Sequence, residues 1–341
     1  MRDSHSEAAS SPKSGAPVIA LSTAYFTARK TEPTGDAIAR EARDLGFSSL
    51  ELDYRLSEVQ LRQLLPYVAR GEVSARSVHH PLPRRKEVPP AEAHIQRAKF
   101  SSFDPDERRA AVRTCAETIS RAADLGAEVV VLHVGRVEIG EDLDPQELER
   151  LYRAGQKQSH AYKELRGLVD AARRAGISAH RDAALLCLDE LCGKALKKGV
   201  SLGLENRYHP VEIPDREDLE IIFRELRGAP IGYWHDTGHA ASLEALGFLP
   251  CQNDLLGAFR ERLLGVHLHD ARGLDDHLPP GEGALDFKAL AAVVAPRARL
   301  VLEVHPPATP ESVVRARHVL EEAGFPVERG EPGPTPSRGT A

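Results

Sequence analysis

The chain is 341 residues long, with 41% hydrophobic residues, 28% charged residues and a formal net charge of −6. A chain of this length and hydrophobicity can bury a large core, so its composition excludes disorder of the whole. Its apolar runs are far shorter than the roughly 20 residues that span a membrane, and no secretion signal opens the sequence, so we expect a soluble, cytoplasmic protein. The negative charge makes nucleic acid an unlikely partner, because binding a phosphate backbone favours a positive surface.

The two ends of the sequence differ in composition from the rest. Residues 1–16 are polar and rich in Ser and Ala, and residues 327–341 are rich in Gly and Pro. Both predict disordered tails on either side of one domain at 17–326. The four cysteines lie in apolar surroundings and lack the paired spacing of a zinc knuckle. We expect all four to be buried, reduced thiols: Cys115, Cys187, Cys192 and Cys251.

In chain order, short β-type runs recur eight times, with amphipathic helical patterns between them. The runs are Val18–Leu21, Ser49–Leu52, Val73–Val78, Val129–Val134, Val200–Leu204, Ile231–Trp234, Leu264–Leu268 and Leu300–Val304. The helical patterns include Asp36–Leu45, Ser57–Ala69, Pro105–Leu125, Arg216–Leu226 and Glu311–Ala323, several of them closed by a glycine. Eight alternations predict parallel strands joined by right-handed crossovers, which close into an α/β fold of the (β/α)8 TIM-barrel type.

An open, doubly wound sheet is the alternative architecture. It lacks its fingerprint here, because no G-x-G-x-x-G follows the first strand and no G-x-x-x-x-G-K-[ST] occurs. One spacing is also unusual for a barrel, since about 65 residues separate the fourth and fifth strands. They contain two helical patterns, Pro145–Arg174 and Arg181–Lys198. Arg181–Lys198 is the expected crossover helix. Pro145–Arg174 then predicts a helical excursion at the barrel mouth, which could serve as a lid or as a surface for a partner. The sequence does not determine the oligomeric state.

Residues of metal-binding types end six of the eight strands, at the edge where TIM barrels place their active sites. They are His79, His133, Glu205, Asp236 with His239, His267 and Glu303, and the loop after the seventh strand adds Asp275 and His277. A single histidine in such a place is more often structural. So many buried ionisable groups, however, would be costly without a compensating cation. Imidazole and carboxylate donors without thiolate suit Zn²⁺ or Mn²⁺.

At two strand ends, histidines stand next to each other or two residues apart, and not all of them can point toward the predicted site. Neighbouring residues of a strand point to opposite sides, so only one of His79 and His80 can face the site, and we choose His79. His269 stands two residues after His267. We leave it open as a ligand or as a supporting group that Asp270 helps to orient.

At these residues the sequence resembles the xylose isomerase-like TIM-barrel superfamily, which contains sugar and sugar-phosphate isomerases and epimerases, inosose dehydratase and the endonuclease IV group. The resemblance runs from about Val18 to Ala323, and its most specific segments are Leu204–Asn206, His235–His239, Gly265–Asp270, Asp275–Gly283 and Leu302–Glu303. It implies a core divalent metal ion held by Glu205, Asp236, His267 and Glu303. By similarity to the endonuclease IV group, His79 and His133 would help to hold a second ion, and His239, Asp275 and His277 a third. One to three ions per chain are therefore expected.

The first interpretation of the reaction is a metal-dependent isomerase or epimerase acting on a sugar, sugar phosphate or polyol. Glu205 and Glu303 would move the proton next to a carbonyl, through an enediolate that the metal stabilises. His239 would contact the substrate, and Arg207 or Arg272 could meet a phosphate.

The second interpretation is a multinuclear zinc phosphoester hydrolase of the endonuclease IV type, with Glu205 bridging two ions. The full set of additional ligands favours it, whereas the acidic charge and the lack of a clear series of basic and wedge-like apolar residues argue against a DNA substrate. We favour the isomerase by association, because sequences with a similar Pro-Gly-Glu-Gly loop are mostly placed among sugar isomerases. A metal-free binding module is a third class, and it would leave nine potential ligands unexplained.

Overall fold

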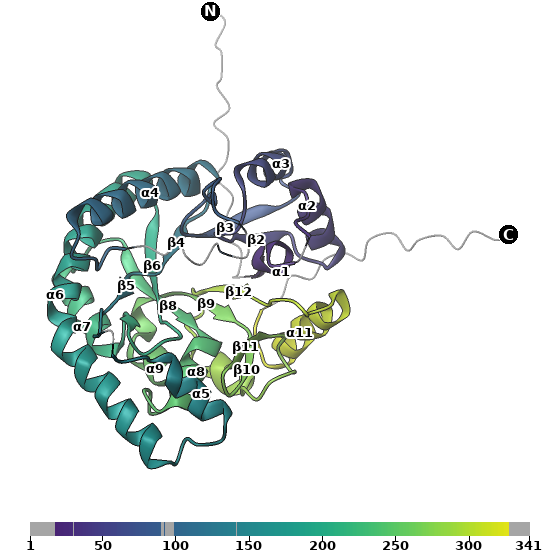
Figure 1. Ribbon diagram of the computed structural model, residues 1–341. Helices are drawn as coiled ribbons and strands as arrows, with labels where there is room; N and C mark the ends of the chain where they lie inside the picture. The colour runs from purple at the N-terminus through teal and green to yellow at the C-terminus, as the bar shows by residue number, and fades with distance from the viewer. Residues whose placement is uncertain (1–17, 30, 90–91, 93–98, 141, 327–341) are drawn as a thin grey trace, which may run out of the picture.

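Eight parallel strands close into a barrel in the computed structural model, which describes residues 18–29, 31–89, 92, 99–140 and 142–326 (Figure 1). The barrel strands are β1 (Ile19–Ser22), β2 (Ser49–Leu52), β3 (Ser74–His79), β4 (Val129–Leu132), β6 (Ser201–Glu205), β8 (Ile231–Asp236), β9 (Leu263–Leu268) and β12 (Arg299–Leu302). β1 pairs in parallel with both β2 and β12, which closes the ring. The predicted TIM barrel is therefore confirmed. The predicted tails at 1–16 and 327–341 lie outside the described residues.

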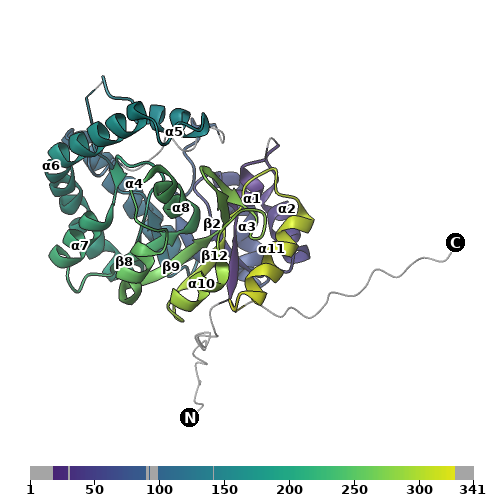
Figure 2. The same ribbon diagram turned by 90° about the horizontal axis from the view of Figure 1, so that it is seen from below.

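Helices surround the barrel, as Figures 1 and 2 show from two directions. They are α1 (Ala24–Thr27), α2 (Gly35–Asp44), α3 (Glu58–Ala69), α4 (Pro105–Asp124), α5 (Gln146–Arg153), α6 (His160–Lys198), α7 (Arg216–Glu225), α8 (Thr237–Leu246), α9 (Asp254–Ala258), the 3₁₀ helix η2 (Arg260–Arg262), α10 (Phe287–Val293) and α11 (Pro310–Glu322). Polar side chains start several of them: Ser57, Asp215 and Thr309 each accept a hydrogen bond in a capping box. None of the helices in the described part of the chain is both long and apolar enough to cross a bilayer.

Two small antiparallel sheets lie beside the barrel. β5 (Gly135–Arg136) pairs with β7 (Glu212–Ile213), and β10 (Asp270–Arg272) pairs with β11 (Asp275–Leu278). Both follow the carboxyl ends of barrel strands. They therefore add structure at the end of the barrel where the predicted site lies.

The inside of the barrel is filled by its own small core, built around Trp234. Its ring is fully buried and packs with Ala20, Val129, Val131 and Val301. A Cβ at Gly265 would lie 2.3 Å from this ring, so the neighbouring strand needs glycine there. Trp234 is therefore a residue of the barrel core.

The long connection between β4 and β6 forms the predicted helical excursion, but the interruption between its two helices lies at a different place from the predicted one. We expected the helix to stop after Arg174, whereas α6 continues from His160 to Lys198. Gly176 lies inside this helix, where Val137 packs against its backbone, 2.9 Å from a Cβ built there. His180 anchors the next turn, with its Nδ1 2.7 Å from the backbone oxygen of Ser101. Contacts with residues distant in the sequence thus accompany the helix across the segment after Arg174, where the sequence predicted its end.

The cysteine prediction is partly wrong. Cys115, Cys187 and Cys192 are buried, but Cys251 is exposed. It lies in the loop after α8, beyond the left-handed Gly247 that ends this helix, rather than in a helix.

Candidate active site and metal centre

Four barrel strands bring one buried carboxylate or imidazole each to a common point at the carboxyl end of the barrel. Nδ1 of His267 on β9 lies 2.8 Å from Oε1 of Glu205, 2.9 Å from Oε2 of Glu303 and 3.6 Å from Oδ2 of Asp236. The four potential ligand atoms all lie within 4.8 Å of one another. The structure thus brings together the four residues that sequence reasoning selected as the core metal ligands.

Asp236 supplies the test of whether these residues fit a cation. Its Oδ1 accepts hydrogen bonds from the backbone N–H of His239, at 2.7 Å, and from Nε2 of His269, at 2.9 Å. Its Oδ2 is buried and has no hydrogen-bond partner among the described residues. A buried carboxylate oxygen that accepts no hydrogen bond is costly, and a cation between the four ligand atoms would satisfy it. The donor set therefore fits a divalent ion of the zinc or manganese type.

The electrostatics keep the carboxyl groups ionised. Burial would raise the pKa of Asp236, but the imidazoles of His239 and His269 bring its pKa well below the usual range. The same opposition of burial and neighbouring imidazoles lowers the pKa of Glu205 and of Glu303. Burial would lower the pKa of His267, yet the surrounding carboxylates raise it well above the usual range. The acidic residues are thus in the form that binds metal ions.

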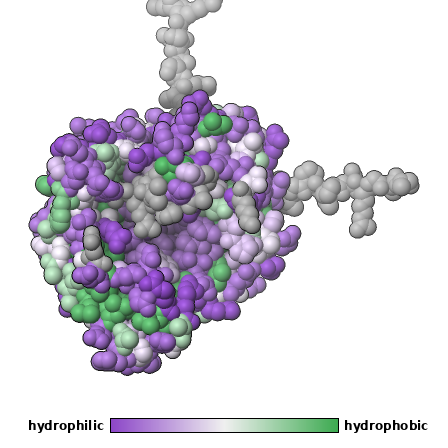
Figure 3. Space-filling view, in the orientation of Figure 1, coloured by the Kyte–Doolittle hydropathy of each residue, from purple (hydrophilic) through white to green (hydrophobic). Residues whose placement is uncertain are grey.

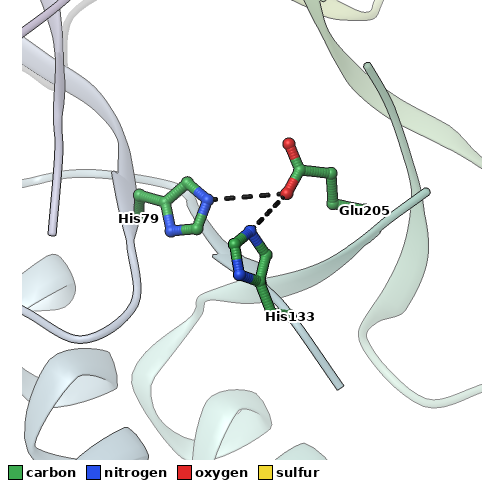
Figure 4. A group of neighbouring side chains, drawn as sticks. All are labelled: His79, His133 and Glu205. Atoms are coloured by element: carbon green, nitrogen blue, oxygen red, sulfur yellow. Dashed lines mark ion pairs between the residues drawn. The ribbon is translucent and has the colours of Figure 1, made fainter. Parts of the chain in front are cut away.

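A second group adjoins the first on the side of β3 and β4 and shares Glu205 with it (Figure 4). Oε2 of Glu205 lies 2.7 Å from Nε2 of His133 and 3.6 Å from Nε2 of His79. His80 points the other way, and its Nδ1 lies 3.0 Å from the hydroxyl of Thr118 on α4. Of the two neighbouring histidines, His79 is therefore the one whose imidazole joins the donor group, although both residues line the same cavity.

A third group lies at the β10–β11 hairpin and differs from the prediction in one residue. His239, Asp276 and His277 come together there, with Nδ1 of His277 3.1 Å from Oδ1 of Asp276. Asp275 does not join them: its side chain is 64% exposed and pairs with Arg153 at 2.7 Å. Regular alternation would have placed Asp275 and His277 on one face, but His277 has a φ of 54°, which breaks the extended geometry of β11.

His269 supports this arrangement, and Asp270 does not orient it as we had expected. Nδ1 of His269 lies 2.8 Å from the backbone N–H of His277 and accepts its hydrogen, so Nε2 carries the hydrogen that Asp236 accepts. Asp270 instead accepts hydrogen bonds from the backbone N–H groups of the following loop, including Gly283 at 2.9 Å. A Cβ at Gly283 would lie 2.2 Å from Oδ1 of Asp270. The Pro-Gly-Glu-Gly sequence is thus explained by a loop folded tightly around a carboxylate.

Above the three groups lies a cavity of about 270 Å³ with polar walls. Figure 3 shows the hollow and its hydrophilic surface on this face of the molecule. Its walls include Tyr54, Arg55, His79, His133, Glu205, Arg207, Tyr208, His209, Glu212, His239, Asp276, His277, Glu303 and His305. A concave site of this size suits a small, hydrophilic molecule.

The two arginines proposed for phosphate binding lie in different places. Arg207 is buried in the cavity wall, where its Nη1 donates to Oε2 of Glu205 at 2.8 Å. Arg272 is exposed and donates to the backbone oxygen of Glu282. The structure thus places Arg207 at the site and Arg272 outside the cavity wall.

Sequence reasoning missed several residues of the cavity. Tyr54 and Arg55 stand two and three residues after the end of β2, and His305 stands three residues after the end of β12. The search for site residues at the ends of the strands could have found all three if it had included the first two or three residues of each following loop.

A closed β/α barrel with a buried carboxylate and imidazole centre at its carboxyl end defines the class of the protein: a TIM-barrel protein with a candidate metal site. The chain belongs to the xylose isomerase-like TIM barrel family, whose model matches residues 39–322. It is 25% identical over 297 residues to the uncharacterized protein y4fM of Sinorhizobium fredii, covering 83% of this chain and 82% of that one.

Two solved structures show the same fold. A D-tagatose 3-epimerase-like protein is 20% identical, with a TM-score of 0.61 and coverage of 90% of this chain and 96% of that chain. A xylose isomerase-like TIM barrel protein from Mycobacterium smegmatis, in complex with magnesium, is 15% identical, with a TM-score of 0.59 and coverage of 90% and 96%.

Proposed function

We propose that this protein is a divalent-metal-dependent isomerase or epimerase of a sugar, sugar phosphate or related polyol. One observation carries the proposal: Glu205 and Glu303 come from different strands, approach the same nitrogen of His267 within 2.9 Å, and both line the cavity. Two carboxylates beside one cation position are what a proton transfer next to a carbonyl requires. The likeness in fold to a D-tagatose 3-epimerase-like protein supports the same class.

In this reaction one carboxylate takes the proton from the carbon next to the carbonyl, and the electron pair of the C–H bond moves into an enediolate. In an isomerisation, the carboxyl group that took the proton returns it to the neighbouring carbon, while a second proton moves between the two oxygens of the enediolate. In an epimerisation, the other carboxyl group must be protonated beforehand; it gives its proton to the opposite face of the same carbon and is left ionised, while the first carboxyl group keeps the proton that it took. Zn²⁺ or Mn²⁺ held by Glu205, Asp236, His267 and Glu303 would stabilise the negative charge of the enediolate. Glu205 is held in place for this role by Nε2 of His133 and by Arg207.

Two residues of the cavity wall are proposed to bind the substrate. Nδ1 of His239 lies 3.1 Å from the backbone oxygen of Asn206 and donates its hydrogen there. Its other nitrogen, Nε2, is then an acceptor for a substrate hydroxyl. Arg207 supplies a buried positive charge that suits an anionic or strongly polar group.

The test is hydrogen exchange in D₂O. The protein is incubated with Mn²⁺ or Zn²⁺ and a panel of ketoses, ketose phosphates and inososes, and NMR follows deuterium at the carbon next to the carbonyl. We expect exchange with at least one member of the panel, and loss of the exchange in Glu303→Gln. Absence of exchange with the whole panel, together with phosphate release from a phosphoester, would favour the second candidate.

The second candidate is a multinuclear zinc phosphoester hydrolase. The observation that favours it is that the groups around His133 and Asp276 flank the central one and that the first of them shares Glu205 with it. Three neighbouring donor sets could hold clustered cations, which suit the neutralisation of a phosphate and the generation of hydroxide.

Asp276 and Asp275 form a matched pair that separates the two candidates. Asp276→Ala removes a donor of the third group, whereas Asp275→Ala removes an exposed carboxylate of the same hairpin. If the protein is a hydrolase of this kind, we expect Asp276→Ala to lower phosphoesterase kcat by at least about 100-fold and Asp275→Ala to leave it close to wild type. Phosphoesterase activity that survives Asp276→Ala at the wild-type rate would rule out the three-metal hydrolase.

A further inference from the structure

Glu51 is a buried carboxylate inside the barrel that belongs to none of the three donor groups. It stands on β2, and its side chain is fully buried. In the order of the barrel strands, β1 and β12 separate β2 from β9, which carries His267. Glu51 therefore reaches His267 across the inside of the barrel rather than along a shared strand pair.

Both oxygens of the Glu51 carboxylate have partners. Oε1 lies 2.9 Å from Nε2 of His267, and Oε2 accepts a hydrogen bond from the hydroxyl of Ser77 at 2.7 Å. The ring of Trp234 packs at 69° to the imidazole of His267, with a centroid distance of 5.2 Å. The imidazole of His267 is thus held by a hydrogen bond to Glu51 and by packing against the ring of Trp234.

This contact decides which nitrogen of His267 is available at the cavity side. A carboxylate only accepts, so Nε2 of His267 carries a hydrogen and donates it to Glu51. Nδ1 faces the carboxylates of Glu205, Asp236 and Glu303, so without a cation it carries a hydrogen as well. A cation bound between these residues would replace the hydrogen on Nδ1, while Glu51 keeps the one on Nε2. Histidine ligands of metal ions are commonly held in this way by a carboxylate on their other nitrogen.

We infer that Glu51 is a positioning residue of the metal site, which holds the ring and the tautomer of His267 so that Nδ1 is presented to the cation. This inference rests on the proposed metal-dependent function. Glu51 itself touches neither the cation position nor the substrate cavity, so its effect on the reaction passes through His267.

The experiment compares metal affinity in three variants by calorimetric titration of metal-free protein with Mn²⁺. Glu51→Gln keeps the shape of the side chain and Glu51→Ala removes the contact. Asp53→Asn is the matched control, because it removes another buried carboxylate just after the same strand, one that pairs with Arg55 and Thr27 instead. We expect affinity to fall by about 10-fold in Glu51→Gln and by up to about 100-fold in Glu51→Ala, and to stay close to wild type in Asp53→Asn.

The outcomes separate this inference from the function on which it rests. Wild-type affinity in both Glu51 variants would overturn the positioning role, even if their thermal stability fell, because a residue that only fills the core changes stability without changing affinity. An equal loss of affinity in Asp53→Asn would also overturn it, since the effect would then belong to buried charge in general. A wild-type protein that binds no Mn²⁺ or Zn²⁺ would contradict the metal-dependent function itself. If Glu51→Ala fails to fold, the comparison of Glu51→Gln with Asp53→Asn still decides.

Discussion

The substitution Glu205→Gln is expected to lower kcat by at least about 10³-fold, whichever of the two reactions the protein performs. Glu205 belongs to two groups of potential metal ligands: the central group and the group with His79 and His133. It is also a candidate base. The amide keeps the size of the side chain but loses the charge. It leaves the imidazoles of His133 and His267, which lie 2.7 and 2.8 Å from the carboxylate oxygens, without their ionic partner.

Initial rates on the substrate identified by hydrogen exchange would measure this loss, and a metal titration would show whether affinity falls with it. Glu282→Gln is the control, because Glu282 is an exposed carboxylate of the Pro-Gly-Glu-Gly loop that pairs with Arg315. Turnover of Glu205→Gln within about 10-fold of wild type would show that Glu205 is neither the base nor an essential ligand.

Removal of divalent ions is expected to abolish activity and to destabilise the fold. Without a cation, Asp236 keeps a buried oxygen that no described residue hydrogen-bonds, and three carboxylates face the imidazole of His267. An ion present at 100 times its Kd would stabilise the protein by about 2.7 kcal/mol, so a chelator should lower the midpoint of thermal unfolding by several degrees.

Activity and the midpoint of thermal unfolding are measured three times: before dialysis against a chelator, after the dialysis, and after Mn²⁺ or Zn²⁺ has been added back. Metal analysis of protein purified without chelator adds the number of ions, for which close to one per chain suits the isomerase and close to three suits the hydrolase. Full activity in protein shown to be free of metal would contradict the metal-dependent mechanism.

The sequence predicted the barrel because its strands are short, buried and regularly spaced, so that local pattern and tertiary structure agree. β2 has the same bounds in the prediction and in the structure, and β8 differs only in continuing to Asp236. α6 differs more, because contacts of Gly176 and His180 with residues far away in the chain carry the helix past an expected boundary.

The candidate site was predictable as far as strand ends define it. Glu205, Asp236, His267 and Glu303 leave their strands at one edge, and parallel pairing brings them together. Asp276 was missed because the conformation of His277 in the hairpin cannot be derived from alternation. Glu51 was missed for another reason: it precedes the end of β2, and only the closed barrel shows that it faces His267.

The helical excursion contacts the β10–β11 hairpin at the edge of the cavity. Arg153 of α5 binds both the side chain of Asp275 and the backbone oxygen of Leu274, next to Asp276 and His277. The helical excursion is thus tied to the loop that carries two of the cavity-wall residues, through one arginine that makes no hydrogen bond to the described barrel strands. A change in the position of α5 would therefore be transmitted to the hairpin and not to the strands of the barrel.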